Sequence, residues 1–182
     1  WAQIVAAGVN DRSLLRGSSL RLALSASEPL PNRLAADWYA LTGKRTRFIN
    51  MFGQTETTGI ISTAALTPES VLEDGIAPIG EALTGNTLYL LDEHDRVIED
   101  DRVGELCISG AGIGAGYWHQ PELTEARFTH HADLGPIYRT GDLGRRRPDG
   151  QFTFRGRGDG QVKIRGHRVE VEEIEAALHT HP

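Results

Sequence analysis

Residues 20–51 constrain the fold of this 182-residue chain more than any other segment. Residues 20–24 form a short apolar run typical of a buried strand, and a second run follows at 46–51. Between them, apolar residues recur at the spacing of one helical face: Leu34, Trp38 and Leu41. Gly43 stands where a helix C-terminal glycine belongs. This order predicts a parallel strand pair with a right-handed crossover, so the loop at 52–58 lies where open α/β sheets bind ligands.

From about Leu66 the pattern changes to short strands and turns, which is typical of an antiparallel sheet. Strands are predicted at three places: 88–91, 96–98 and 105–109. A turn is predicted at 92–95, and Asp149-Gly150 predicts a hairpin between 145–148 and 151–154. We therefore expect an α/β part followed by a small antiparallel, barrel-like sheet. After these strands, a helical face is predicted on three residues: Val171, Ile174 and Leu178.

The charge distribution bears more on function than the net charge of −6. Residues 139–168 hold nine basic side chains against three aspartates, so a basic segment lies within an acidic chain. A local anion site, such as one for phosphate, and a solvated arginine face both explain this pattern. No aromatic residue is interleaved with Arg145, Arg146 and Arg147, so no nucleic-acid partner is predicted.

Cys107 is the only cysteine, so no internal disulfide can form, and we expect a cytoplasmic protein. Because it lies between Leu106 and Ile108 with no obvious base beside it, we expect a core residue rather than a nucleophile. No apolar stretch approaches the ~20 residues that a membrane helix needs, so no membrane partner is predicted. The chain begins with Trp1 rather than Met, and we expect it to be a piece of a longer protein.

Two other patterns imitate functional motifs. Residues 110–115 fit a dinucleotide-binding glycine pattern, but the sequence after them, through Pro121, cannot open the helix that would hold a pyrophosphate. Metal-binding side chains also occur in pairs without a matching second cluster, and exposed loop histidines explain them: His130-His131 with Asp133, and His179 with His181.

Four segments together carry chemistry that none carries alone: 50–56, 104–110 with 116–117, 138–143, and 156–166. The first offers an aromatic face, a hydroxyl and a carboxylate on a strand-end turn, a set that can stack a base, bond a phosphate oxygen and hold Mg²⁺. Asp142 is suited to accept two hydrogen bonds from a ribose diol. Arg157 could bond the sugar or offset phosphate charge.

In this order the four segments resemble the adenylate-forming superfamily, and most closely the adenylation domains of nonribosomal peptide synthetases. The most specific part is GRGDGQVKIRGHRVEVEEIE at 156–175, since acyl-CoA ligases usually diverge at QVKIRG. The resemblance implies ATP-dependent activation of an amino acid or related carboxylic acid as an acyl-adenylate, with release of pyrophosphate. The acyl group would then pass to the phosphopantetheine thiol of a carrier protein.

The implied fold is a fragment of an acyl-adenylate synthetase in three parts. Residues 1–65 would be the C-terminal part of the α/β core subdomain, and 66–157 a β-rich distorted barrel. Residues 158–182 would be a hinge and the start of the C-terminal lid domain.

The resemblance also implies roles for individual residues. Phe52 would stack on adenine, and Glu56 would bind Mg²⁺. The remaining nucleotide contacts would be Ala26, Ser27, Glu28, Asn50, Gly53, Thr55, Asp142, Phe154 and Arg157. Asp159 would be the hinge residue, with Lys163 and Gly166 on a loop that faces the site in the thioester-forming state. The walls of the acid pocket would include Ala23, Ser25, Met51, Gly59 and Ile60.

The chain departs from the family pattern at several points. The usual phosphate loop with its lysine and the usual C-terminal catalytic lysine have no counterpart, so we expect the 182 residues alone to be inactive. The usual tyrosine is Phe52, and the usual proline is Gln54, a choice that also occurs in acyl-CoA ligases. The usual glycines before Glu28 are Ala26 and Ser27. Two alternatives stay open: an acyl- or aryl-CoA ligase, and a degenerate, non-catalytic nucleotide-binding module.

Overall fold

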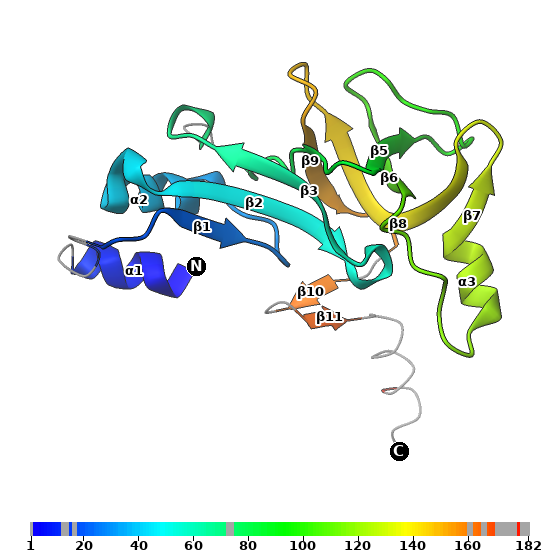
Figure 1. The fold of residues 1–182 in the computed structure, drawn as a ribbon, viewed down its shortest axis with the longest axis horizontal. Helices are drawn as coiled ribbons and strands as arrows, with labels where there is room; N and C mark the ends of the chain where they lie inside the picture. The colour runs from blue at the N-terminus through cyan, green and yellow to red at the C-terminus, as the bar shows by residue number, and fades with distance from the viewer. Residues whose placement is uncertain are drawn as a thin grey trace.

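The computed structural model describes residues 2–11, 15, 18–71, 75–159, 162–164, 167–169 and 178. Strands within these residues form three sheets (Figure 1). The first sheet has four strands in chain order: β1 (Leu22–Ser25), β2 (Arg47–Gln54), β3 (Gly59–Leu66) and β4 (Glu81–Ala82).

The predicted strand–helix–strand unit is confirmed. β1 and β2 are parallel, with Leu22 opposite Arg47, and α2 (Asn32–Thr42) connects them. Gly43 follows α2 with φ +67°, and its N–H donates to the carbonyl oxygen of Tyr39. This positive φ explains why glycine ends the helix. β3 then returns antiparallel to β2, so the loop between them lies at the carboxyl end of a parallel strand, as predicted.

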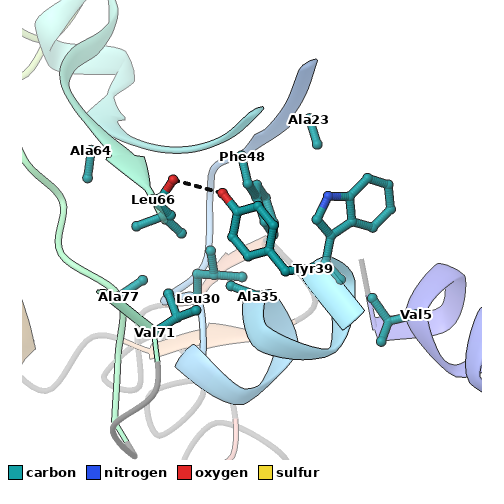
Figure 2. Packing of buried hydrophobic residues seen from close by; sticks show 11 residues of the cluster. Val5, Ala23, Leu30, Ala35, Tyr39, Phe48, Ala64, Leu66, Val71 and Ala77 are labelled. Atoms are coloured by element: carbon teal, nitrogen blue, oxygen red, sulfur yellow. Dashed lines mark hydrogen bonds between the residues drawn. The ribbon is translucent and has the colours of Figure 1, made fainter. Parts of the chain in front are cut away.

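A first hydrophobic core lies between α2 and the first sheet (Figure 2). The Trp38 side chain is 1% exposed, and its ring centroid lies 5.9 Å from that of Phe48. The Tyr39 hydroxyl donates a 2.7 Å hydrogen bond to the carbonyl oxygen of Leu66. α1 (Ala2–Asn10) packs against α2 and contributes Val5 to the same core. These contacts fix the helix to the sheet.

The second sheet is antiparallel and has the order β5-β6-β8-β7, with β9 also paired to β8. Its strands are β5 (Asn86–Leu91), β6 (Val103–Gly110), β7 (Phe128–His131), β8 (Gly135–Arg146) and β9 (Phe152–Arg157). β7 pairs with the first part of β8 and β9 with its last part, while β6 lies along the other edge. The long β8 bends between them (Figure 1), which gives the predicted barrel-like form.

The two sheets share a second core. Phe52 and Ile61 of the first sheet pack with Leu106 and Tyr138 of the second. A bridge between Gly80 and Phe152 joins the sheets by main-chain hydrogen bonds. Any site built from β2 and β8 is therefore supported by one packed interior.

Most of the predicted turns and strands are confirmed, and one strand is not. The hairpin at 145–154 forms, with Arg147 N–H donating to the carbonyl oxygen of Gln151 at 2.8 Å. The strand predicted at 96–98 is wrong, because only a single bridge joins Val97 to Leu91. The segment still runs antiparallel to β5, with the Ile98 N–H donating to the carbonyl oxygen of Leu90 at 2.8 Å, but the carboxylate of Asp92 accepts the N–H of Arg96 in place of a main-chain partner.

The remaining elements connect these sheets. α3 (Pro121–Arg127) precedes β7, and a two-stranded antiparallel sheet joins β10 (Val162–Ile164) to β11 (His167–Val169). Short 3₁₀ helices are η1 (Gly43–Arg45), η2 (Thr55–Thr57) and η3 (Glu69–Val71). The helix predicted on Val171, Ile174 and Leu178 falls outside the described residues except for Leu178. The division of the chain at residues 65 and 157 stays a prediction.

Candidate functional site

The turn between β2 and β3 is tight because two segments approach closely. A Cβ on Gly53 would lie 1.8 Å from the carbonyl oxygen of Gly59, so only glycine fits there. η2 then carries the chain back into β3. The turn places Gln54 and the half-buried Glu56 close together at the end of β2.

A glycine-rich loop at 110–116 lies against this turn. The N–H of Gly114 donates to the carbonyl oxygen of Glu56 at 2.8 Å. The Tyr117 hydroxyl donates to the Glu56 carboxylate, also at 2.8 Å. As predicted, the loop runs on without opening a helix until α3, so it holds the turn in place rather than forming a dinucleotide-binding motif.

Asp142 lies on β8 and is 1% exposed. Its N–H donates to the buried hydroxyl of Thr140 at 2.9 Å, which fixes the main chain. Gln54 Nε2 donates to its Oδ2 and Arg157 Nη1 to its Oδ1, each at 2.7 Å. The Tyr138 hydroxyl donates to Gln54 Oε1 at 2.8 Å. Three predicted motifs therefore meet at one carboxylate.

A chain of ion pairs extends from this carboxylate. Arg157 also donates to both oxygens of Asp159, through Nε at 2.9 Å and Nη2 at 2.5 Å. Arg127, at the end of α3, donates to Asp159 at 2.7 Å. Burial by itself lowers the pKa of Arg157, but its hydrogen bonds to Asp159 and Asp142 raise that pKa above the ordinary value. We call these residues the Asp142 cluster: Gln54, Arg127, Tyr138, Asp142, Arg157 and Asp159.

Gly141 explains why a glycine precedes Asp142. It has φ +73°, and its N–H donates to Glu105 Oε1 at 3.0 Å. A Cβ here would lie 2.3 Å from Asp159 Oδ2 and 2.8 Å from an Nη atom of Arg157. The ion pairs therefore occupy the space that any other residue would need.

Arg139 anchors the other side of Glu105. It donates to Glu105 Oε2 at 2.6 Å and to Asp95 Oδ1 at 2.5 Å. Burial by itself lowers the pKa of Arg139, but these carboxylates raise that pKa above the ordinary value. Glu105 is thereby held where it can fix the main chain beside Asp142.

Four predicted nucleotide residues directly follow the adjoining strands β1 and β2. Ser27 is exposed and has φ +77°. This positive φ explains why the family favours glycine at the position. Ala26 is half-buried, while Glu28 and, on η2, Thr55 are exposed.

Three further predicted nucleotide residues are more enclosed. Asn50 is 3% exposed, and its amide donates to the carbonyl oxygen of Pro78 at 2.8 Å. Phe52 is 8% exposed within the second core, so contact with a base would be limited to a small part of its ring. Phe154 is half-buried against the same core.

The predicted acid-pocket residues divide between two faces of the first sheet. Ala23 and Ser25 are 4% and 5% exposed on the face that α2 covers. Met51 lies on the other face, because side chains alternate along a strand. Its side chain is half-buried. Gly59 and Ile60 begin β3, exposed and half-buried respectively. The structure therefore brings Ala23 and Ser25 together and separates them from Met51.

Three predicted residues follow β9. Asp159 is held in the Asp142 cluster with a side chain 24% exposed. Lys163 lies in β10, while Gly166 is outside the described residues.

Sequence reasoning did not find three members of the site: Arg127, Tyr117 and Tyr138. Arg127 lies 32 positions before its partner Asp159, and in sequence it resembles an ordinary cation at the end of a helix. The tyrosines lie in the segments 116–117 and 138–143, but only their contacts with Glu56 and Gln54 assign them a place.

The carboxylate of Glu56 is a suitable ligand for the Mg²⁺ predicted at this position. Mg²⁺ takes hard oxygen ligands and usually binds one or two carboxylates together with phosphate oxygens. Among the described residues no group of three or more His, Cys, Asp or Glu side chains gathers as a metal site. Protein ligands in this part of the chain would therefore be few, with the nucleotide supplying others.

Among the histidines singled out in the sequence, His131 has structural contacts. His131 Nε2 lies 2.7 Å from the carbonyl oxygen of Asp95, and its Nδ1 accepts the N–H of Asp133. His179 and His181 lie outside the described residues. Cys107 is fully buried, as expected for a core residue. No helix in the described part of the chain is long and apolar enough to span a membrane.

The chain is similar to known proteins throughout. The AMP-binding enzyme family matches residues 1–118. Surfactin synthase subunit 1 of Bacillus subtilis is 43% identical over 77% of this chain and 4% of its own length. Tyrocidine synthase 1 of Brevibacillus parabrevis is 38% identical over 91% of the chain and 15% of its own length.

Solved structures of proteins with adenylation domains are also similar to this chain. The NRPS protein PA1221, which contains adenylation and PCP domains, superposes with TM-score 0.87 at 34% identity over all of this chain and 32% of its own. The Vibrio cholerae adenylation domain AlmE, in complex with glycyl-adenosine-5'-phosphate, matches with TM-score 0.83 at 29% identity over 97% of the chain and 34% of its own. The chain thus spans about a third of the solved relatives and a smaller share of the synthetases. It belongs to the AMP-binding enzyme family, alongside the adenylation domains of nonribosomal peptide synthetases.

Proposed function

We propose that this chain forms part of an enzyme that uses ATP to activate an amino acid, or a related carboxylic acid, as an acyl-adenylate. The observation that carries the proposal is the Asp142 cluster, because it joins the end of β2, the bend of β8 and the end of β9 at one buried carboxylate. An aspartate carboxylate can accept hydrogen bonds from both hydroxyls of a ribose, and the donors around Asp142 hold this one in a single orientation.

In this proposal different residues around Asp142 bind the ribose, the base and the phosphates of the nucleotide. Asp142 binds the ribose, with Arg157 bonding the sugar beside it. Glu28 and its neighbours Ala26 and Ser27 line the base, against the exposed edge of Phe52. Thr55, which is exposed at the start of η2, meets the phosphates.

Magnesium would bind at Glu56, whose side chain the Tyr117 hydroxyl orients at 2.8 Å. When bound, the ion would offset the negative charge of the phosphates. The contribution of this chain is to hold the carboxylate in one orientation, through Tyr117 and through the loop that packs on the main chain of Glu56.

The acceptor of the acyl group is proposed from the relatives. PA1221 carries a PCP domain next to its adenylation domain, which supports a phosphopantetheinylated carrier protein as the partner. Asp159 then serves as the hinge, and Lys163 faces the site in the thioester-forming state. We propose that the 182 residues alone do not complete the reaction, because they span about a third of the solved relatives.

The second candidate is an acyl- or aryl-CoA ligase, which shares the first half-reaction and uses a free thiol as acceptor. One observation favours it: Gln54 replaces the usual proline and its side chain is built into the site. The complex of AlmE with glycyl-adenosine-5'-phosphate supports an amino acid instead.

ATP–pyrophosphate exchange on the complete protein that carries this chain separates these candidates. Separate pools of amino, 2-keto, aryl and fatty acids are supplied with ATP and Mg²⁺. Exchange driven by amino or keto acids is the expected result. Exchange with aryl or fatty acids alone would favour the CoA ligase, and silence in every pool with ATP still bound would favour a degenerate binding module.

A further inference from the structure

Asp142 is enclosed in a way that bears on how a nucleotide reaches it. Its side chain is 1% exposed, and a protein donor contacts each of its two oxygens. A ribose can therefore touch this carboxylate only after one of these donors gives way. This inference rests on the nucleotide site proposed above.

The two donors are not equally easy to displace. Arg157 is charged, 9% exposed, and bonded to both oxygens of Asp159 as well as to Asp142. Moving it would leave Asp142 without its cation and Asp159 with Arg127 alone, which is costly because the Asp142 carboxylate is buried. Gln54 is neutral and half-buried, and it lies on the turn at the end of β2. A neutral amide is the weaker donor to a carboxylate.

We propose that the amide of Gln54 is an internal competitor that occupies Asp142 Oδ2 in the empty site and yields to a ribose hydroxyl when a nucleotide binds. The exchange is one neutral donor for another, so the carboxylate stays satisfied in both states. Gln54 thus sets nucleotide affinity without needing to touch the nucleotide. The Tyr138 hydroxyl, 2.8 Å from Gln54 Oε1, holds the amide in its competing position.

The test measures binding by isothermal titration on the complete protein that carries this chain. The probes are ATP–Mg²⁺ and its 2′-deoxy and 3′-deoxy analogues. The variants are Gln54→Ala, which removes the competitor, and Tyr138→Phe, which only loosens it. Gln120→Ala is the control for an exposed glutamine, and Tyr39→Phe for a buried tyrosine hydroxyl remote from the site.

Gln54→Ala should bind ATP about threefold to tenfold more tightly than the wild type, the equivalent of one net hydrogen bond. At least one deoxy analogue lacks the hydroxyl that replaces the amide, so its affinity should not change. Discrimination between ATP and that analogue therefore grows. Tyr138→Phe should shift in the same direction by less, and both controls should leave the discrimination unchanged.

Weaker or unchanged ATP binding in Gln54→Ala would overturn the proposal, as would an equal gain for ATP and both analogues. Those results would leave the nucleotide site itself intact, provided the wild type binds ATP. A wild type that does not bind ATP would instead refute the proposed function, and the inference with it.

Discussion

Replacing Gly141 by alanine tests the packing of the Asp142 cluster. A Cβ at this position would lie 2.3 Å from Asp159 Oδ2, well inside contact distance. Arg127 and Arg157 each have an Nη atom 2.8 Å away, so the carboxylate cannot shift without disturbing its cations. Gly141→Ala should therefore break or lengthen the ion pairs of Asp159.

Gly135 is a matched control for this change. Gly135 and Gly141 both have φ +73°, but nothing lies within 4 Å of a Cβ placed on Gly135. The left-handed conformation costs each alanine about 1–2 kcal/mol, and the smaller entropy of the unfolded chain applies to both variants. The difference between the variants isolates the clash.

That difference should be about 1–2 kcal/mol of unfolding free energy. Charged hydrogen bonds contribute about 1.5–3 kcal/mol, and the lower range applies because Asp159 is 24% exposed. Urea unfolding followed by the fluorescence of buried Trp38 measures it. When Asp159→Ala is added to both variants, Gly141→Ala should lose little more unfolding free energy than Gly135→Ala does. Equal costs for Gly141→Ala and Gly135→Ala would refute the packing described for the cluster.

Other predictions concern single groups. Burial raises the pKa of the Cys107 thiol to about 12, so it should resist a thiol reagent at pH 8 and react only after unfolding; prompt labelling of the native protein would contradict this. The N–H of Arg96, followed by that of His94, lowers the pKa of Asp92 from 3.8 to about 2, which an NMR titration should show. Since the folded pKa is the lower one, the stability from Asp92 is present above pH 3.8 and is lost as the pH falls through 2; Asp92→Asn should abolish that dependence. Tyr39→Phe should cost about 1 kcal/mol in urea unfolding by leaving the Leu66 carbonyl without its donor, and no loss would argue against that hydrogen bond.

The local pattern of the sequence was enough to predict the unit from β1 to β2. Helical spacing at Trp38, a glycine at the C-terminal end of the helix and two apolar runs are all short-range signals. The strand expected at 96–98 is reduced to one bridge with Leu91, because the Asp92 side chain takes the N–H of Arg96 that a longer ladder would pair with the main chain. The alternation of apolar and polar residues does not reveal a side chain that competes for main-chain N–H groups.

The site was predictable in its motifs and not in its connections. Asp142, Arg157 and Asp159 were identified from their motifs, and the structure joins them by ion pairs. Arg127 was not found, since its pairing with Asp159 spans 32 residues and depends on how α3 docks beside β8. The role of Gln54 was likewise invisible, because a sequence does not show that its amide lies 2.7 Å from a carboxylate 88 positions away.

The most direct test of the account is the affinity of the complete protein for ATP–Mg²⁺ with and without the charge of Asp142. Isothermal titration compares the wild type with Asp142→Asn, after thermal unfolding has confirmed that the variant is folded at the assay temperature. We expect the wild type to bind ATP and the variant to bind it at least about tenfold more weakly, because a charged hydrogen bond is lost. A folded Asp142→Asn protein that keeps the wild-type affinity for ATP would contradict the nucleotide site proposed at this carboxylate.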